Sequence, residues 1–187
     1  LNNISIENLH SALSDRISKA IPAQLPVLKM RATDINGSIM EAVAINEVSL
    51  FRSTHQSVHV KIIIDNNERM SKLVSDGVIV ATPAGSTAYN FSAGGSILPL
   101  DSNLLSLTSI NSFRPRRWRG ALLPSKSIVK LQVIDPKNRS ATAVSDYTNF
   151  ANVSEVIIQK DENLFIELLF DSEYELSEKI ISEQFLF

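Results

Sequence analysis

The chain has 187 residues, of which 44% are hydrophobic and 20% charged, and its formal net charge is −2. These values fit a soluble globular protein of one or two domains. The slight acidity argues against general nucleic-acid binding, which usually needs a basic surplus. The absence of cysteine excludes disulfides, a thiolate nucleophile and cysteine-ligated zinc. No apolar run approaches the roughly 18 residues of a membrane-spanning helix.

The first third of the chain predicts a helix followed by strands. Apolar residues at intervals of three and four predict a helix over residues 5–21, which Pro22 would end. From residue 25 the pattern favours strands, the first of which extends to residue 33. Asn36-Gly37 is the strongest short hairpin signal, so we expect residues 38–51 to be the return strand.

Two adjacent polar residues, Asn46 and Glu47, interrupt that expected return strand. Neighbouring strand residues point to opposite faces, so the pair fits only where the strand ends or bulges. One interpretation is a bulge with the Glu47 carboxylate in solvent. The other is a carboxylate that accepts hydrogen bonds from a ligand's hydroxyls, which is a usual way to hold a ribose.

The stretch from Asp76 to Gly95 combines a buried strand, a tight turn and a short helix. Residues 78–81 are an apolar run typical of a buried strand, and residues 82–86 form a turn of small residues. Residues 87–93 predict about two helical turns, closed by Gly94-Gly95. Free N–H groups at the helix start, with the Ser86 and Thr87 hydroxyls, would suit a phosphate or a ribose. A strand-turn-helix corner without a ligand is the alternative.

The remaining segments predict mostly strands. Residues 58–64 and 69–74 would pair antiparallel across a turn at 65–68. Residues 103–108 predict a helical turn or a short helix. We expect one hairpin of residues 128–134 and 140–145, a last hairpin of residues 153–159 and 164–170, and an acidic terminal helix over residues 173–185. So many short strands predict a mainly β fold, a β-sandwich with a helix at each end.

The densest positive charge lies in residues 113–120, where four arginines surround Trp118. Phosphate contacts and stacking could bind nucleic acid. The patch is short in an acidic chain, which favours contact with a phosphorylated small molecule or with an acidic surface of another subunit. His10, His55 and His59 are not accompanied by other metal-ligating residues at the spacing of a known metal site.

The stretch from Asp76 to Gly95 resembles the glycine-rich signature of bacterial NAD kinases. Asn46-Glu47 matches that family's Asn-Glu motif, and residues 113–120 and 183–185 look like its alphaproteobacterial branch. The likeness extends over essentially the whole chain. The matching runs are Asp76-Gly77, Thr82-Pro83-Ala84-Gly85-Ser86-Thr87-Ala88-Tyr89 and Ser92-Ala93-Gly94-Gly95.

The resemblance implies an activity, a cofactor and partners. NAD kinases transfer a phosphoryl group from ATP, or in some members from polyphosphate, to the 2′-hydroxyl of the adenosine ribose of NAD, which makes NADP. They use Mg²⁺ or another divalent cation. The resemblance further implies a cytosolic homodimer or homotetramer without a nucleic-acid or membrane partner.

The resemblance also implies which residues of this chain bind NAD. Glu47 would hold ribose hydroxyls, and Tyr89 would stack on a base. Asp76 would bind the nicotinamide or adenine end, often across a subunit interface, and Thr148 stands where the family has Gln. The implied substrate-binding residues are Asn46, Glu47, Asp76, Ala84, Thr87, Ala88, Tyr89, Asn90, Phe91, Ser92, Asp146 and Thr148.

The family's Gly-Gly-Asp-Gly motif, whose Asp is the proposed general base, does not occur in the chain. The resemblance therefore implies that most of an N-terminal α/β domain lies outside this chain and that the chain alone is inactive, with no catalytic residue of its own. We expect a linker helix in residues 1–24, an NAD-binding β-sandwich in 25–172 and a C-terminal helix in 173–187 that packs back toward the N-terminal domain. The alternatives are a non-catalytic NAD- or NADP-binding module and a lipid kinase of the diacylglycerol or sphingosine type.

Overall fold

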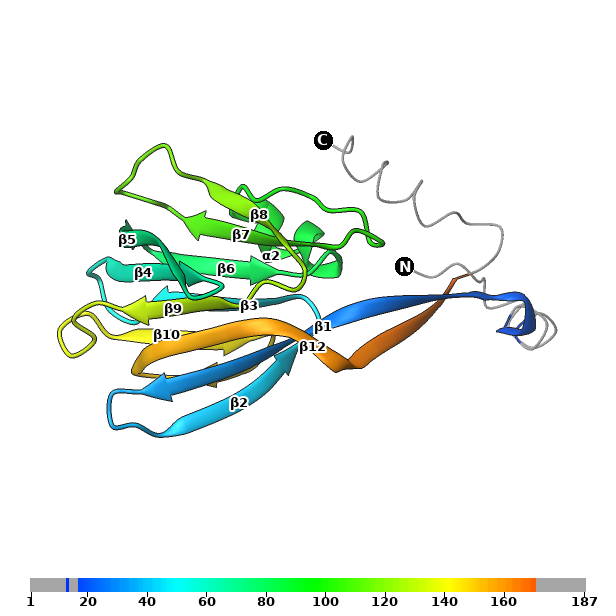
Figure 1. Cartoon of the computed structure of the whole chain (residues 1–187), viewed down its shortest axis with the longest axis horizontal. Coiled ribbons are helices and arrows are strands. Elements are labelled where there is room, and N and C mark those ends of the chain that lie inside the picture. The colour runs from blue at the N-terminus through cyan, green and yellow to red at the C-terminus, as the bar shows by residue number, and fades with distance from the viewer. Residues whose placement is uncertain (1–12, 14–16, 171–187) are drawn as a thin grey trace.

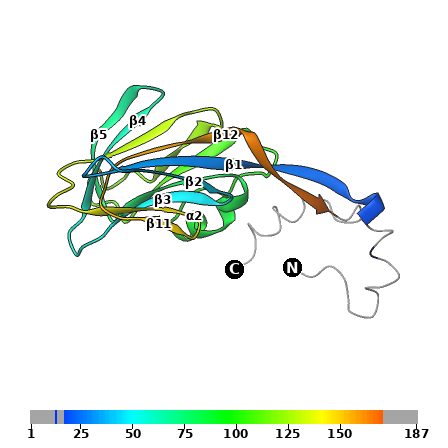
Figure 2. The ribbon, with the colours of Figure 1, turned by 90° about the horizontal axis from the view of Figure 1, so that it is seen from below.

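The computed structural model describes Leu13 and residues 17–170, which form two stacked antiparallel sheets of six strands each (Figures 1 and 2). In spatial order, the first sheet contains β2 (Ile39–Ala44), β1 (Ile21–Asp34), β12 (Val153–Phe170), β9 (Val129–Val133), β4 (Val58–Ile64) and β5 (Asn67–Ser75). The second contains β11 (Thr148–Phe150), β10 (Ala141–Ser145), β3 (Glu47–Arg52), β6 (Gly77–Ala81), β7 (Leu104–Ile110) and β8 (Gly120–Pro124). The predicted mainly β sandwich is confirmed.

Side-chain alternation gives each sheet one face toward a shared core. In β4 every second residue from Val58 to Ile64 is buried, and in β3 Val48 and Leu50 are fully buried. Residues of both sheets join in a single core cluster. The outer face of the second sheet carries a smaller apolar cluster of Ile79, Ala81 and Ile110, with Phe51 and Ala93 packed against it.

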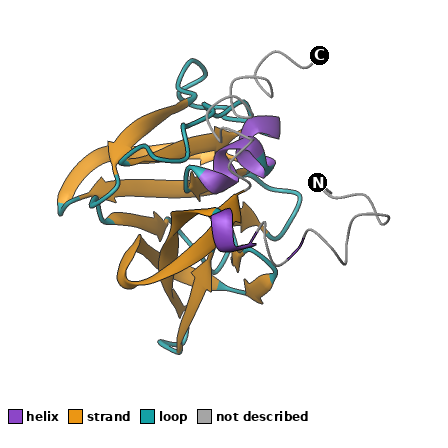
Figure 3. Ribbon diagram, turned by 90° about the vertical axis from the view of Figure 1, so that its right-hand side faces the viewer, coloured by secondary structure: helices purple, strands orange, loops and turns teal. Residues whose placement is uncertain are grey.

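Two short helical segments cover part of that outer face. After β6 the chain forms η2 (Ala84–Thr87), a single 3₁₀ turn, and then α2 (Tyr89–Ser92). The expected two-turn helix over residues 87–93 is therefore shorter, and Gly94 ends it with φ of +83°, a left-handed conformation that glycine adopts readily. Figure 3 shows the short helical segments gathered at one end of the sandwich.

The expected return strand over residues 38–51 is in fact two strands in different sheets. The hairpin at Asn36-Gly37 is confirmed, and β2 pairs with β1. β2 then ends at Ala44 in the first sheet, whereas β3 begins at Glu47 in the second. Ile45 and Asn46, which we call the crossing segment, carry the chain between the sheets. The strand therefore ends at the polar pair, as the sequence required.

Three further local predictions are wrong: one concerns the type of element and two concern pairing partners. Residues 103–108 are not helical: β7 begins at Leu104, and its Leu105 and Leu107 face the core. Residues 128–134 and 140–145 do not pair, since β9 lies in the first sheet and β10 in the second. The expected last hairpin is one continuous strand, β12.

Residues 161–163, which were expected to form a hairpin turn, instead form part of a bulge within β12. The Asp161 carboxylate accepts hydrogen bonds from the backbone N–H groups of Asn163 and Leu164 at 2.8 and 3.0 Å. These bonds fold the residues of β12 that have no partner on β1 into a local turn. Pairing with β1 continues on both sides, because Leu28 lies opposite Lys160 and Pro26 lies opposite Phe165. Figure 1 shows β1 and β12 side by side beyond the rest of the sandwich.

The two expected terminal helices lie mostly outside the described residues. Of the first, residues 17–19 are helical, but Ile21 begins β1, so the helix does not extend to that residue. The second, over residues 173–185, falls entirely outside. Among the described residues, no helix is long and apolar enough to cross a membrane.

Candidate functional site

The crossing segment is held in place by the carboxylate of Asp146. The Ile45 N–H donates to Asp146 Oδ2 at 2.7 Å, and the Asn46 and Glu47 N–H groups donate to Oδ1 at 3.1 and 3.2 Å. Asp146 sits in the turn between β10 and β11 with φ of +49°, and its own N–H donates to the Glu47 carbonyl at 3.2 Å. Hydrogen bonds to an ionised acceptor are strong. The Asp146 side chain therefore positions Asn46 and Glu47 by binding their backbone N–H groups.

The turn after β6 fixes the same segment from the other side. The Thr82 N–H donates to the Asn46 carbonyl at 2.9 Å, and its hydroxyl donates to the Ile45 carbonyl at 2.7 Å. The Gly85 backbone lies directly against Asn46, where an added Cβ would overlap the Asn46 carbonyl group. Glycine at position 85 is thus required by this close approach. Segments about 40 and 100 residues apart in sequence meet here.

The Glu47 carboxylate has a hydrogen-bond acceptor atom without a donor among the described residues. Val48 and Leu50 face the core, so alternation directs Glu47 to the outer face of the second sheet. Its Oε2 atom is buried and finds no hydrogen-bond partner among the described residues. Burial raises the pKa of Glu47, and the negative charge of Asp146 raises it further. The carboxylate is half-buried, so the interpretation that places it in solvent is wrong.

The helical segments η2 and α2 bring exposed side chains beside this face. The Tyr89 ring lies 5.8 Å from the Phe51 ring of β3, with the planes tilted by 33°, and Tyr89 remains 40% exposed. Ala84 and Ala88, the two alanines expected to bind NAD, are half-buried. Exposed side chains that could contact a ligand here are Thr87, Tyr89, Phe91 and Ser92.

Two polar residues of this turn face inward. The Ser86 hydroxyl accepts from the Leu98 N–H at 2.9 Å and donates to the Pro83 carbonyl at 2.7 Å, so the expectation that it faces a phosphate is wrong. Asn90 is fully buried; its amide donates to the Ser86 and Ser96 carbonyls at 3.0 and 3.1 Å. Its carbonyl accepts from the Thr108 hydroxyl at 2.6 Å. These bonds anchor α2 on the second sheet.

Asp76 lies at the opposite end of the same sheet. Glu47 pairs with Ala81, whereas Phe51 pairs with Gly77, the residue after Asp76. Four residues of strand separate these pairs, which is about 13 Å at 3.3 Å per residue. The structure therefore does not bring the Asp76 carboxylate together with the Asn-Glu pair in one chain.

The Asp76 carboxylate has two hydrogen-bond partners within the chain and is still partly exposed. Its oxygens accept from Asn111 Nδ2 at 3.0 Å and from Arg52 Nε at 2.6 Å. The Asn111 hydrogen bond and the Arg52 charge lower the pKa of Asp76 against the opposing effect of burial. Arg52, Asn111 and Thr82 are not among the site residues expected from the sequence, because their roles depend on contacts between distant segments.

Thr148 begins β11 and pairs with Ser145, on the far side of the turn that holds Asp146. Thr148 is half-buried, whereas Tyr147 in the same turn is 92% exposed. Among the described residues, no three His, Asp or Glu side chains gather as a metal site. The site thus offers hydrogen-bond acceptors, hydroxyls and an aromatic ring, which are groups suited to a nucleoside.

A sequence profile of the ATP-NAD kinase C-terminal domain matches residues 45–168, which include every site residue described above. The chain belongs to the ATP-NAD kinase family. NAD kinase of Rickettsia bellii is 46% identical over 185 residues, covering 99% of this chain and 71% of that protein. NAD kinase of Hyphomonas neptunium is 48% identical over 94% of this chain and 69% of that protein. NAD kinase of Rhizobium meliloti is 44% identical over 99% and 70%.

Solved structures of ATP-NAD kinase family members share the fold. Yeast NADH kinase, in a crystal structure complexed with NADH, superimposes with a TM-score of 0.84 at 22% identity, covering 99% of this chain but 55% of that one. An NAD kinase from Archaeoglobus fulgidus, in complex with ATP, gives a TM-score of 0.77 at 22% identity over 98% of this chain and 68% of that one. The chain therefore spans about half to two thirds of the length of these structures.

Proposed function

We propose that this chain supplies the NAD-binding part of an NAD kinase, which transfers a phosphoryl group from ATP or polyphosphate to the 2′-hydroxyl of the adenosine ribose of NAD. The observation that carries the proposal is Glu47 Oε2, a buried acceptor that finds no partner in the described part of the chain. A buried acceptor without a donor costs free energy until a ligand provides one. The ribose hydroxyls of NAD are such donors.

The surrounding residues divide the work of binding. Glu47 accepts hydrogen bonds from ribose hydroxyls, while the exposed Asn46 side chain contacts the substrate beside it. Tyr89 stacks on a base, because its ring packs against Phe51 while the residue remains 40% exposed. Thr87 and Ser92 offer hydroxyls. Asp146 and Asn90 keep the crossing segment and α2 in position.

Asp76 serves the site of a second copy of the chain. It lies about 13 Å along the sheet from the Asn-Glu pair, so one dinucleotide end could meet the Asp76 of another subunit. This separation supports the homodimer or homotetramer that the family resemblance implies. We place the assembly in the cytoplasm on the same basis.

In this proposal, the residues that bind the phosphoryl donor and the residue that acts as general base lie outside the described part of the chain. The described residues do not fit a metal cage of their own, and Mg²⁺ usually arrives coordinated to nucleotide phosphates. We propose residues 1–24 as a linker to an α/β domain, residues 25–172 as the NAD-binding sandwich, and residues 173–187 as a helix that packs back toward that domain. The chain alone then binds NAD without forming NADP.

Calorimetric titration of the full chain with NAD tests the proposal. We expect saturable binding that Glu47→Gln weakens at least about tenfold, the loss of one hydrogen bond to a charged group. Asp101→Asn is the control, because Asp101 is exposed in the loop between α2 and β7, and its carboxylate makes no hydrogen bond or ion pair with the described site residues. Equal affinity for NAD in wild type and Glu47→Gln would contradict the assignment.

An assay of NADP formation with ATP and Mg²⁺ separates the remaining alternatives. Turnover by this chain alone would overturn the view that catalysis needs residues outside it. A longer chain that includes a Gly-Gly-Asp-Gly segment should turn over. NAD binding without turnover in that longer chain would instead favour a non-catalytic module, and phosphorylation of diacylglycerol or sphingosine would favour a lipid kinase.

A further inference from the structure

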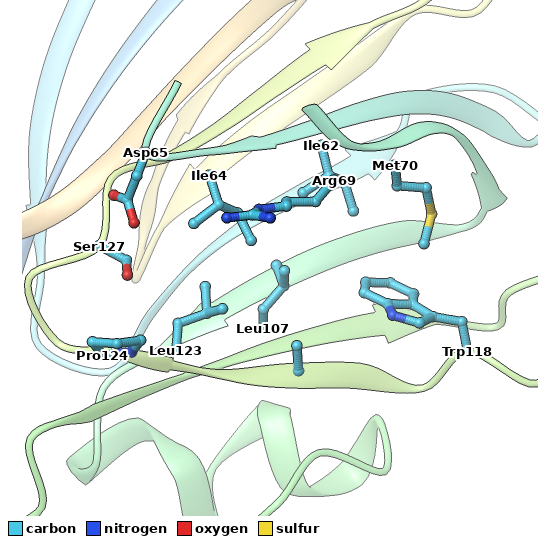
Figure 4. A pocket seen from close by; sticks show the side chains of 11 residues that line it. Ile62, Ile64, Asp65, Arg69, Met70, Leu107, Trp118, Leu123, Pro124 and Ser127 are labelled. Carbon is cyan, nitrogen blue, oxygen red and sulfur yellow. The ribbon is translucent and has the colours of Figure 1, made fainter. Parts of the chain in front are cut away.

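A cavity of about 460 Å³ opens between the two sheets where the edge strands β5 and β8 face each other (Figure 4). Ile62 of β4 and Leu107 of β7, each 1% exposed, line it from opposite sheets and close its floor. Ala121 and Pro124 line its mouth and are exposed. The volume lies in the range of small-molecule pockets, which are mostly apolar with a few polar groups.

A distortion in β5 directs two neighbouring residues to this cavity. Met70 pairs with Ile62 and Glu68 pairs with Ile63, so Arg69 has no partner on β4. Regular alternation would send Arg69 and Met70 to opposite faces, but a bulge re-aims side chains. Both residues line the cavity. Figure 4 shows the Arg69 side chain extending across it, with Met70 and Trp118 at one end.

Arg69 keeps an uncompensated charge at this opening. It makes no hydrogen bond or ion pair within the described part of the chain. Glu68 pairs with Lys61 at 3.3 Å, away from Arg69.

Asp65 also lines the cavity, where its Oδ1 accepts from the Ile128 N–H at 2.9 Å. Figure 4 shows Asp65 beside Ser127, at the end of the cavity opposite Met70 and Trp118. An apolar chamber with one free guanidinium at its mouth suits a ligand that has an apolar body and an anionic head.

We propose that this cavity binds a free, small amphipathic carboxylate. Its apolar body lies between Trp118, Met70 and Leu123, where burial of apolar surface stabilises the complex. Its carboxylate pairs with the Arg69 guanidinium, whose planar donors match a carboxylate in bidentate fashion. A neutral apolar ligand would form no ion pair with Arg69 and should therefore bind more weakly.

The cavity is distinct from the proposed NAD site. Leu107 lines it from the core side of β7, whereas the adjacent Thr108 points to the outer face and donates to Asn90 of α2. The proposal therefore does not depend on NAD binding, and its test can succeed or fail independently.

Trp118 is the only tryptophan of the chain, so its fluorescence reports on the cavity directly. The full chain is titrated with decanoate and, in parallel, with the neutral analogue decanol, both below the concentration at which they aggregate. We expect a saturable change in Trp118 emission with decanoate bound at least tenfold more tightly than decanol. The absence of a saturable change would overturn the proposal.

Two variants and a control locate the site. Arg69→Met should make decanoate and decanol bind equally, while decanol affinity stays near the wild-type value. Ala121→Phe at the exposed mouth should weaken both ligands. The control is Arg114→Met, since the Arg114 guanidinium lies 4.3 Å from the Phe113 ring centroid, outside the cavity lining. Circular dichroism verifies folding of each variant.

Two outcomes would overturn the assignment. One is an equal loss of decanoate affinity in Arg69→Met and Arg114→Met, which would indicate nonspecific attraction by arginine. The other is a change in Trp118 emission that follows protein concentration rather than decanoate, together with dimerisation measured by light scattering. That result would assign the cavity to a second copy of the chain.

Discussion

The two ends of the second sheet hold their acidic side chains in opposite ways. At one end, Glu47 Oε2 is buried without a partner in the described part of the chain, and the pKa of Glu47 is raised. At the other end, Asp76 is held by Asn111 and Arg52, and its pKa is lowered. The same β3 strand carries Glu47 at its start and Arg52 at its end.

The two carboxylates therefore differ in what the free chain offers them: Glu47 Oε2 has no donor among the described residues, whereas Asp76 already has two partners. An unpaired buried acceptor lowers the stability of the free protein, and a ligand that donates to it removes the cost. A paired, partly exposed carboxylate contributes little net stability and fixes geometry instead. We therefore expect substitutions at the Glu47 end to affect stability and NAD binding strongly, and those at the Asp76 end to affect stability weakly.

The largest expected effect comes from Gly85→Ala. The new methyl group would overlap the Asn46 carbonyl, so the crossing segment must move. We expect the free energy of unfolding in urea to fall by about 2–3 kcal/mol, as for overpacked sites, and NAD affinity to fall with it. Gly37→Asn is the control, because nothing lies within 4 Å of that position and Asn tolerates a left-handed turn. Wild-type stability in Gly85→Ala would show that the close approach is not required.

Asp146→Asn comes next, because it weakens the three backbone hydrogen bonds that hold residues 45–47. An amide has one acceptor oxygen, and its NH₂ group would face the N–H donors. We expect a loss of about 2 kcal/mol in the free energy of unfolding, typical of hydrogen bonds to a charged group. Asp101→Asn should leave stability unchanged. If both variants unfold at the same urea concentration as wild type, Asp146 does not hold the crossing segment.

Glu47→Gln should stabilise the free chain while weakening NAD binding. The pKa of Glu47 is raised in the folded state, so the folded chain holds this proton more tightly than the unfolded chain. Wild-type stability therefore falls as pH rises through the ordinary glutamate value of about 4.3 and up to the raised folded pKa. We expect the variant to be more stable by up to about 1 kcal/mol at neutral pH.

Thermal unfolding between about pH 4 and pH 7 measures this effect. The stability difference between Glu47→Gln and wild type should grow as pH rises through the window. Glu162→Gln, at an exposed position of β12, should show no such growth. A variant less stable than wild type at pH 7 would mean that the Glu47 carboxylate already has a donor in the free chain.

Much of the fold follows from local patterns, but sheet membership does not. The alternation over residues 58–64 corresponds to β4, and Asn36-Gly37 marks a real hairpin. The Asp-Pro segment at 135–136 has the composition of a hairpin turn, yet it carries the chain between sheets. A turn signal reports that the chain changes direction, and long-range packing decides which strand it meets.

The site shows the same division. The adjacent polar residues Asn46 and Glu47 correctly indicated where a strand ends. The small residues of the turn suggested room for a ligand beside the backbone, but the group that approaches Gly85 is the Asn46 backbone of the same chain. The inward orientation of Ser86 could not be read from its neighbours, because its partner Leu98 is 12 residues away. Likewise, the pairing of Asp76 with Asn111 depends on β6 and β7 lying side by side.

Asp76→Asn should have the smallest effect and the opposite pH slope to Glu47→Gln. The pKa of Asp76 is lowered in the folded state, so its contribution is fully present above the ordinary aspartate value of about 3.9 and is lost as pH falls toward the folded pKa. Its side chain is 36% exposed, so we expect a loss below about 1 kcal/mol at neutral pH. Urea unfolding at about pH 7, 5 and 3 should show the gap between variant and wild type narrowing toward acid. A gap that stays constant to about pH 3 would mean that Asn111 and Arg52 hold this position without using its charge, and the contrast between the two ends of the sheet would then be one of burial alone.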